Sequence, residues 1–466
     1  MQDTQVKIPK RILNTLLSSL SAGVVPRVGA PYIAIGRIEE IGSLLDNLAE
    51  VSEGGAFCRF LIGRYGSGKS FLIQLIRGYA LDRGFICLDA DLSPERRLTG
   101  GNGAGLATYR ELLTNMAIKA SPDGGALPTV LSRYLTALKT ELISAGFSPD
   151  TPEFDKELKA RVFTMLAELE GDVGGFDFAR VLSEYYLASI SGNSDRKSSC
   201  LRWLRGEFST KTEAKGALGF SVSTIIDDDN WYNFVKLYAR LSVKLGYSGL
   251  ILFVDECVNL YKIPNRIARE ANYEKLLAIF NDTLQGKASS LGVIFGGTPQ
   301  FLEDTRRGLF SYDALRSRLS DTKYTELGYR SLSEPVIRLR RLSDNELLAL
   351  VKRLASLYKE REAGREIPID DDGIERFVRC ELSRAGADEM VTPREVIRDF
   401  LMLLNILRDN KNVKLDELIS RIGDGKDVSP ESPMSHFVNS SPDSSIPAPS
   451  TTAEPKRKIG LFDIEI

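Results

Sequence analysis

The sequence predicts an α/β protein in which helices surround an open, parallel β-sheet. Short apolar runs recur along the chain, and segments with the periodicity of amphipathic helices separate them. Continuous apolar runs are typical of parallel strands that are buried on both faces. The segment 57–80, FCRFLIGRYGSGKSFLIQLIRGYA, also has the pattern of a buried strand, a glycine-rich turn and a helix. Such sheets bind ligands at the carboxyl ends of their strands.

Five apolar runs have the length of a strand, and we expect them to form one sheet. One run begins the segment 57–80. The others lie in GFICLDADLSPE (84–95), GLILFVDE (249–256), SLGVIFGGTP (290–299) and PVIRL (335–339). The second run ends in acidic residues.

Helical periodicity occupies most of the remaining sequence. It is found at 6–22, within 31–48, over most of about 100–245 and again after 340. Two of the late helices carry start signals. Ser343 and Glu346 have the spacing of a capping box, and Thr392 is a helix cap followed by Pro393.

These elements divide the chain into parts. We expect an N-terminal helical segment (1–30), an α/β domain (31–340) with a helical insertion at about 100–245 after its second strand, a helical domain (341–424) and a tail (425–466). The insertion either carries a partner surface or only supports packing. The tail is rich in Ser and Pro and is predicted to be disordered. Its tip, KRKIGLFDIEI, is either a docking peptide or a solvated end.

Composition narrows the class of protein. A hydrophobic content of 43% over 466 residues predicts a globular chain with a large core, and a net charge of −2 gives no overall attraction to nucleic acid or anionic membranes. The five cysteines are scattered, with Cys58, Cys87 and Cys257 in apolar runs, which indicates reduced thiols in a cytoplasmic protein. His436 is the only histidine, so zinc sites and histidine catalysis are not expected. No signal peptide or run of membrane-spanning length is present.

The motif GRYGSGKS at 63–70 predicts a phosphate-binding loop. It matches G-x-x-x-x-G-K-[ST] at every fixed position and lies between a predicted strand and a predicted helix. Backbone N–H groups of such a loop cradle phosphates, Lys69 reaches the β- and γ-phosphates, and the Ser70 hydroxyl holds Mg²⁺. The alternative is an ordinary strand-to-helix turn. The residues expected to bind ATP are Gly63, Arg64, Tyr65, Gly66, Ser67, Gly68, Lys69, Ser70 and Phe71.

The apolar strand LILFVDE supplies two carboxylates at its end. Asp255 is expected to orient Mg²⁺ through a coordinated water, together with Ser70 as the other metal residue. Glu256 is expected to polarise the attacking water as a general base. The alternative is an acid pair that stabilises the N-terminus of the next helix.

GRYGSGKS, ILFVDE, GVIFGGTP and the late TPRE together resemble the AAA+ P-loop ATPases. The resemblance implies a parallel five-stranded sheet with residues 341–424 as a helical lid. The upstream AIGRIEE is similar to a short box that lines the adenine pocket in related ATPases, which implies that Ile35, Gly36 and Arg37 lie near the base. The alternative for this segment is a plain transition from a loop into a helix.

A narrower resemblance covers the chain up to about residue 410. GRYGSGKSFLIQLIRGYA, GLATYRELLTN, the segment 272–319 and TPREVIRDFL resemble the ATP-binding family of BREX-type bacterial phage-defence loci, in particular BrxD-like proteins. The resemblance implies protein partners encoded in the same locus. It does not extend to the Ser/Pro-rich tail.

The AAA+ resemblance also assigns two residues that sense the γ-phosphate. Thr298, just past a central strand, would help to position the attacking water. The alternative is that Thr298 caps the next helix. Arg394 in TPRE would report the γ-phosphate to the lid, and a cation in a first helical turn favours an anionic partner. The alternative is a surface arginine.

Two arginine pairs precede the fifth strand. Arg306 and Arg307 follow Glu303, and the spacing of Glu303 and Arg307 favours an ion-paired helix. Arg316 and Arg318 in SYDALRSRL lie where AAA+ proteins place the arginine finger. Two helical positions at this spacing point about 200° apart, so both arginines cannot point at one phosphate unless the helix ends between them. The alternative is a solvated helix face. We expect Arg318 to be the finger and Arg316 to support it, which implies a homo-oligomer.

The predicted function is hydrolysis of ATP, with Mg²⁺, to drive assembly or remodelling of a phage-defence complex. One alternative is a STAND-like nucleotide switch with slow hydrolysis, and another is a DNA-stimulated motor or loader. The glycine-rich segment 92–105, LSPERRLTGGNGAG, either contacts nucleic acid or a neighbouring protein, or is a polar loop. No DNA-reading motif follows TPRE, so composition and motifs do not support nucleic-acid binding.

Overall fold

A parallel β-sheet forms the centre of the molecule. The computed structural model describes residues 8–149, 151–321, 323, 331–362, 369–383, 392–410 and 412–423. In these residues five strands pair in the order β2-β3-β4-β1-β5, and every pair is parallel. The strands are β1 (Ala56–Ile62), β2 (Ile86–Asp91), β3 (Leu250–Asp255), β4 (Leu291–Gly297) and β5 (Val336–Arg338). The predicted α/β fold with a parallel five-stranded sheet is confirmed, whereas the predictions for the tail and its tip lie outside the described residues.

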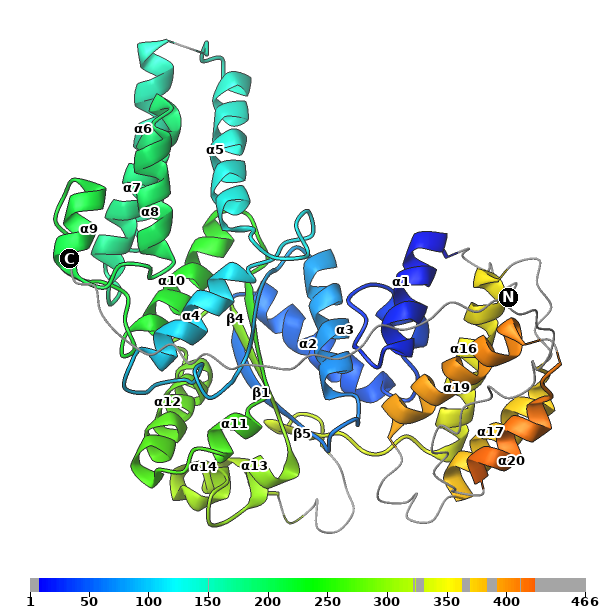
Figure 1. The fold of residues 1–466 in the computed structure, drawn as a ribbon. Coiled ribbons are helices and arrows are strands. Elements are labelled where there is room, and N and C mark those ends of the chain that lie inside the picture. The colour runs from blue at the N-terminus through cyan, green and yellow to red at the C-terminus, as the bar shows by residue number, and fades with distance from the viewer. Residues whose placement is uncertain are drawn as a thin grey trace, which may run out of the picture. The chain divides into compact units, whose positions relative to one another are not determined.

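One face of the sheet is covered by two helices, α2 (Ile38–Ser52) and α3 (Lys69–Asp82) (Figure 1). Leu44 and Leu48 from α2 and Leu72 from α3 share a core with Phe57 and Ile251 of the strands. Because alternate side chains of a strand point to opposite faces, this core takes one half of each strand's apolar residues. The loop between β1 and α3 is thereby held against the end of the sheet.

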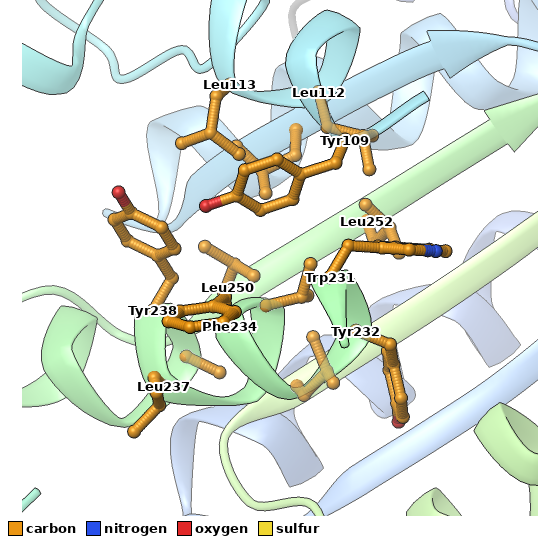
Figure 2. Packing of buried hydrophobic residues seen from close by; sticks show 14 of the residues in the cluster. Tyr109, Leu112, Leu113, Trp231, Tyr232, Phe234, Leu237, Tyr238, Leu250 and Leu252 are labelled. Carbon is orange, nitrogen blue, oxygen red and sulfur yellow. The ribbon is translucent and has the colours of Figure 1, made fainter. Parts of the chain in front are cut away.

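The opposite face is covered by α4 (Ala104–Thr114), α10 (Trp231–Lys244) and α12 (Arg266–Leu284). Figure 2 shows Tyr109 of α4 and Tyr238 of α10 in one buried cluster with Leu250 of β3. The hydroxyl groups of both tyrosines donate to the carbonyl oxygen of Leu204, at 2.7 and 3.2 Å. The first and last helices of the segment between β2 and β3 therefore belong to the core of the sheet.

The other helices between β2 and β3 pack mainly on one another. Contacts run from α5 to α6, from α6 to α7, from α7 to α8 and from α8 to α9, and α7 also packs on α10 (Figure 1). Their bounds are α5 (Leu127–Ser144), α6 (Pro152–Ala167), α7 (Gly175–Ser191), α8 (Ser194–Leu204) and α9 (Lys211–Leu218).

Helical elements of different lengths connect β3, β4 and β5. Between β3 and β4 lie α11 (Val258–Tyr261) and α12, and between β4 and β5 lie α13 (Pro299–Glu303), η2 (Leu309–Ser311) and α14 (Asp313–Leu319). The three cysteines predicted to be core thiols, Cys58, Cys87 and Cys257, are buried and free. Burial raises the pKa of Cys87 to about 12, so its thiol stays protonated and unreactive.

The chain's first helix packs with its last ones. After β5 come α16 (Asp344–Arg361), α17 (Asp371–Ser383), α19 (Pro393–Asp409) and α20 (Leu415–Gly423). Leu13 and Leu17 of α1 (Lys10–Ser21) share one core with Leu354, Phe400 and Leu404 of α16 and α19. Figure 1 shows α1 beside α19. The predicted caps of α16 and α19 are confirmed as capping boxes. In the described residues, no helix is both long and apolar enough to cross a membrane.

Candidate nucleotide-binding site

The glycine-rich loop follows β1 directly and ends at the first residue of α3. Gly66 and Gly68 have φ angles of +73° and +94°, a left-handed conformation that favours glycine. The N–H of Gly63 donates to the carbonyl oxygen of Gly297 on β4, at 3.1 Å. The loop is therefore anchored to the sheet at its start and to a helix N-terminus at its end, which is the arrangement that binds phosphate groups.

Lys69 folds back over this loop. Its Nζ donates to the carbonyl oxygens of Gly63, at 2.9 Å, and Arg64, at 3.2 Å. Burial lowers the pKa of Lys69, while the nearby carboxylates of Asp255 and Glu256 act in the opposite direction. The site thus holds a partly desolvated cation beside the turn where an anionic phosphate would enter.

Ser70 and Asp255, the two predicted metal residues, are in direct contact. The Ser70 hydroxyl donates to Oδ2 of Asp255 at 2.6 Å, and the other carboxylate oxygen accepts from the backbone N–H of Glu256 at 2.8 Å. The whole Asp255 residue is only 8% exposed. A hydroxyl and a carboxylate are oxygen donors that suit Mg²⁺, which takes few protein ligands and keeps its remaining positions for water and phosphate oxygens.

Glu256 leaves the end of β3 in a left-handed conformation, with a φ of +56°. This conformation is uncommon for a residue with a side chain, and it costs about 1–3 kcal/mol where the surroundings enforce it. The next N–H, that of Cys257, donates to Gly296 on β4 at 3.0 Å, which holds the turn in place. Glu256 lines the same pocket as Lys69 and Ser70.

A third carboxylate, Asp91, lies at this edge of the sheet and is no part of the site that the sequence predicts. It ends β2 and is paired with Asp255 in the register of the sheet. Desolvation and the neighbouring carboxylates of Asp255 and Glu256 raise the pKa of Asp91. The acidic end of the second strand is visible in the sequence. The position of Asp91 beside Asp255 cannot be read from the sequence, because strand order is a property of the folded sheet.

One pocket joins the loop to an apolar wall. Its lining includes residues 65–70 of the loop together with Glu256, Arg37 and Arg394. The apolar wall is formed by Leu20, Val24, Val25, Pro26, Ile33, Ile35, Phe71, Leu342, Leu350 and Ile397. The sequence does not predict that the segment 24–26 lines this pocket. Its one signal is a Val-Val-Pro run in a short connection. Val24 in this run is 57% exposed.

Of the three residues expected near a base, Ile35 and Arg37 line the pocket and Gly36 does not. The Arg37 side chain is buried, and its guanidinium donates to the carbonyl oxygens of Ser67, at 3.0 Å, and Arg340, at 2.7 Å. A Cβ on Gly36 would lie 2.7 Å from Leu342. Arg37 is thus bonded to the backbone of the loop.

Arg394 lines the pocket from the first turn of α19. Its Nε donates to the carbonyl oxygen of Gly23 at 2.6 Å, a contact between residues 371 positions apart in the sequence. The predicted sensor therefore lies at the pocket, next to the segment 24–26 that forms part of the apolar wall.

The other predicted site residues that do not line the pocket in the single chain are Gly63, Arg64, Asp255, Thr298, Arg316 and Arg318. Thr298 is buried and caps α13, since its Oγ1 accepts from the N–H of Phe301 at 3.3 Å. Arg316 and Arg318 are exposed on α14, and Arg318 donates to the carbonyl oxygen of Ala314 at 2.7 Å. The role of the two arginines in a neighbouring copy stays a prediction.

The predicted helical ion pair between Glu303 and Arg307 is wrong, because α13 ends at Glu303. Glu303 instead pairs with Arg338 at 3.2 Å. The Arg307 guanidinium lies 5.3 Å from the ring centroid of Tyr261 and donates to the carbonyl oxygen of Ile263 at 3.3 Å.

The glycine-rich segment after β2 uses its backbone donors inside the protein. The carboxylate of Asp228 accepts from the N–H groups of Gly100, Gly105 and Leu106, all at 2.8–2.9 Å. Asn272 accepts from two further N–H groups at the start of this loop. A carboxylate therefore occupies the position that a phosphate would need, so these N–H groups are not free to bind nucleic acid.

A comparison with protein families finds a match over most of the chain. Residues 8–422 match the family model described as "BREX system ATP-binding protein BrxC/D". No curated protein matches the chain. The matched range includes the loop at 63–70, Asp255, Glu256 and Arg394.

Proposed function

The chain belongs to the family of BREX system ATP-binding proteins BrxC/D, and from this premise we propose that it binds and hydrolyses Mg²⁺-ATP to drive assembly or remodelling of an anti-phage defence complex. One observation carries the proposal. The hydrogen bond between Ser70 and Asp255 joins the glycine-rich loop to the end of β3, and Ser70 lines one pocket with Lys69 and Glu256.

The chain's residues divide the binding of ATP between them. The N–H groups of the loop and the Lys69 ammonium bind the β- and γ-phosphates. Ser70 and Asp255 would hold Mg²⁺, which would neutralise charge on the phosphates. The apolar wall, including Val24 and Ile397, takes the flat base.

Glu256 would act on the attacking water. Its carboxylate accepts a proton as the water oxygen bonds to the γ-phosphorus, and the bond from that phosphorus to the bridging oxygen breaks to release ADP. The turn at the end of β3 holds Glu256 in position before substrate binds, so little reorganisation is needed at the moment of reaction.

We assign the chain to the AAA+ class and propose the corresponding division of labour. Residues 31–340 form the ATPase domain, the insertion at about 100–245 carries or supports a partner surface, and residues 341–424 form a lid with Arg394 as its sensor. Thr298 would help to position the attacking water. Arg318 of one copy would complete the site of another, with Arg316 supporting it. The exposure of both arginines on α14 favours such a contact.

The test compares two variants with the wild type. Lys69→Ala is expected to lose ATP binding, whereas Glu256→Gln is expected to keep binding and lose turnover by about 100-fold or more. Isothermal titration gives the binding, and phosphate release gives the turnover. Turnover of Glu256→Gln at the wild-type rate would contradict the assigned base. Slow single turnover with retained nucleotide would indicate a switch, and stimulation by DNA would indicate a motor.

A further inference from the structure

Two buried arginines hold the segments on either side of β5. Arg59 on β1 donates to Oδ1 of Asn47 at 2.7 Å and to the carbonyl oxygens of Ser333 and Glu334, just before β5. Arg37 donates to the carbonyl oxygen of Arg340, just after β5. The two residues are 8% and 5% exposed. Because β5 is a three-residue edge strand, it gains few ladder hydrogen bonds and needs such anchors.

Of these two arginines, Arg37 alone has a second target in the nucleotide site. The guanidinium nitrogen that donates to Arg340 also donates to the carbonyl oxygen of Ser67, within the glycine-rich loop. A planar trans peptide has its C=O and the following N–H on opposite sides. Holding the Ser67 oxygen toward Arg37 therefore turns the N–H of Gly68 the other way. Gly68 lines the nucleotide pocket, where backbone N–H groups would meet phosphate oxygens.

We infer that Arg37 is a positioning residue for the nucleotide, which sets the direction of the Gly68 N–H by fixing the Ser67 carbonyl. The inference rests on the proposed binding of ATP. It differs from a role near the base, which the resemblance to related ATPases implies, because both hydrogen bonds of Arg37 beyond its own helix go to backbone oxygens. Glu40, with a carboxylate oxygen 3.5 Å away, balances the buried charge.

The same residue links the loop to the late helices. Arg340, whose carbonyl Arg37 holds, pairs through its own side chain with both carboxylate oxygens of Glu346, at 2.6 and 2.5 Å. Glu346 closes the capping box at the start of α16. A displacement of α16 would therefore move Arg340. Because Arg37 donates to both Arg340 and Ser67, this movement would also shift the Ser67–Gly68 peptide.

Arg59 supplies a matched control, because it is a buried arginine that holds the same edge strand through hydrogen bonds outside the loop. Arg37→Gln and Arg59→Gln should both lower stability. Only Arg37→Gln should weaken binding of Mg²⁺-ATP, by about tenfold or more, since a misdirected N–H removes a charge-assisted hydrogen bond to phosphate. Arg37→Lys keeps the positive charge but lacks the planar guanidinium, so it should weaken binding of Mg²⁺-ATP less, by about threefold.

Titrations with ATP, GTP and inorganic tripolyphosphate separate positioning from base contact. If Arg37 positions the loop, Arg37→Gln weakens the binding of all three ligands by a similar factor. The affinities of Arg59→Gln stay within about twofold of those of the wild type. Unchanged binding in Arg37→Gln and Arg37→Lys would overturn the inference, as would equal losses in Arg37→Gln and Arg59→Gln. A loss confined to ATP would also overturn it. Failure of the wild type to bind ATP would instead refute the proposed function.

Discussion

The side chain of Thr392, which caps α19, lies directly against Gly66 of the glycine-rich loop. A Cβ placed on Gly66 would lie 2.6 Å from both Cβ and Oγ1 of Thr392. Gly66 also has a left-handed backbone, with a φ of +73°. The N-terminus of α19 therefore touches the loop at a position that has no room for a side chain.

Gly66→Ala is expected to destabilise the protein by more than backbone strain alone, which is about 1–2 kcal/mol for a left-handed residue. The additional loss comes from the clash with Thr392. Gly54→Ala is the matched control, because Gly54 is also left-handed, with a φ of +94°, and a Cβ added there would have no neighbouring atom within 4 Å. Urea denaturation measures both. An equal loss of stability in Gly66→Ala and Gly54→Ala would show that α19 moves to accommodate the added methyl group.

Arg318→Ala is expected to keep ATP binding and to lower turnover per protomer by about 10³-fold, the effect of losing an arginine finger. Arg316→Ala should lower turnover less. The check is phosphate release as a function of protein concentration. Mixing Arg318→Ala with Lys69→Ala should restore part of the activity, since one variant supplies an intact loop and the other an intact Arg318. If the mixture stays inactive, the site is not shared.

The ion pair of Glu346 and Arg340 should stabilise the protein only at higher pH. Hydrogen bonds from Arg340 lower the pKa of Glu346 from 4.5 to about 2. A depressed pKa means that the carboxylate favours the folded state above pH 4.5, and that this contribution is lost as the pH falls toward 2.

Glu346→Gln keeps a capping oxygen and removes the charge. It is expected to lower the free energy of unfolding at pH 7 by about 1 kcal/mol, and the difference from wild type should shrink below pH 4.5. Denaturation at a series of pH values measures it. In a protein that already carries Arg340→Gln, Glu346→Gln should lower the free energy of unfolding only slightly. A difference that is constant with pH would exclude the ion pair as its source.

Asp228→Ala is expected to lower the free energy of unfolding by about 2–4 kcal/mol, because three backbone N–H groups lose their acceptor. Asp229→Ala is the neighbouring control and should change stability by less than about 0.5 kcal/mol, as its side chain is exposed. Chemical denaturation compares the two. Similar small effects would mean that water replaces the Asp228 carboxylate.

Much of the nucleotide site is predictable because its signals are local. The loop at 63–70 and the acid pair after β3 each occupy one short segment, where residue type and the neighbouring strand decide the conformation. The direct contact of Ser70 with Asp255 is possible because β1 and β3 end at the same edge of the parallel sheet, although β4 lies between them. The capping boxes of α16 and α19 are equally local.

The remaining parts depend on contacts between distant segments. The hydrogen bonds of Arg37 to Ser67 and Arg340, and that of Arg394 to Gly23, have no signature in the sequence near any of these residues. The Glu303–Arg307 spacing is misleading because Asp304, whose side chain accepts from the N–H groups of Arg306 and Arg307, ends the helix first. Side-chain bonds to nearby backbone groups compete with helix continuation in this way.

The packing of α1 against α19 sets a constraint on biosynthesis. Leu13 and Leu17 are translated long before their core partners Phe400 and Leu404. Domains generally fold as units during synthesis, with N-terminal ones first. Here the core around α1 cannot be complete until α19 has been translated, so docking of α1 is a late step in the folding of these helices.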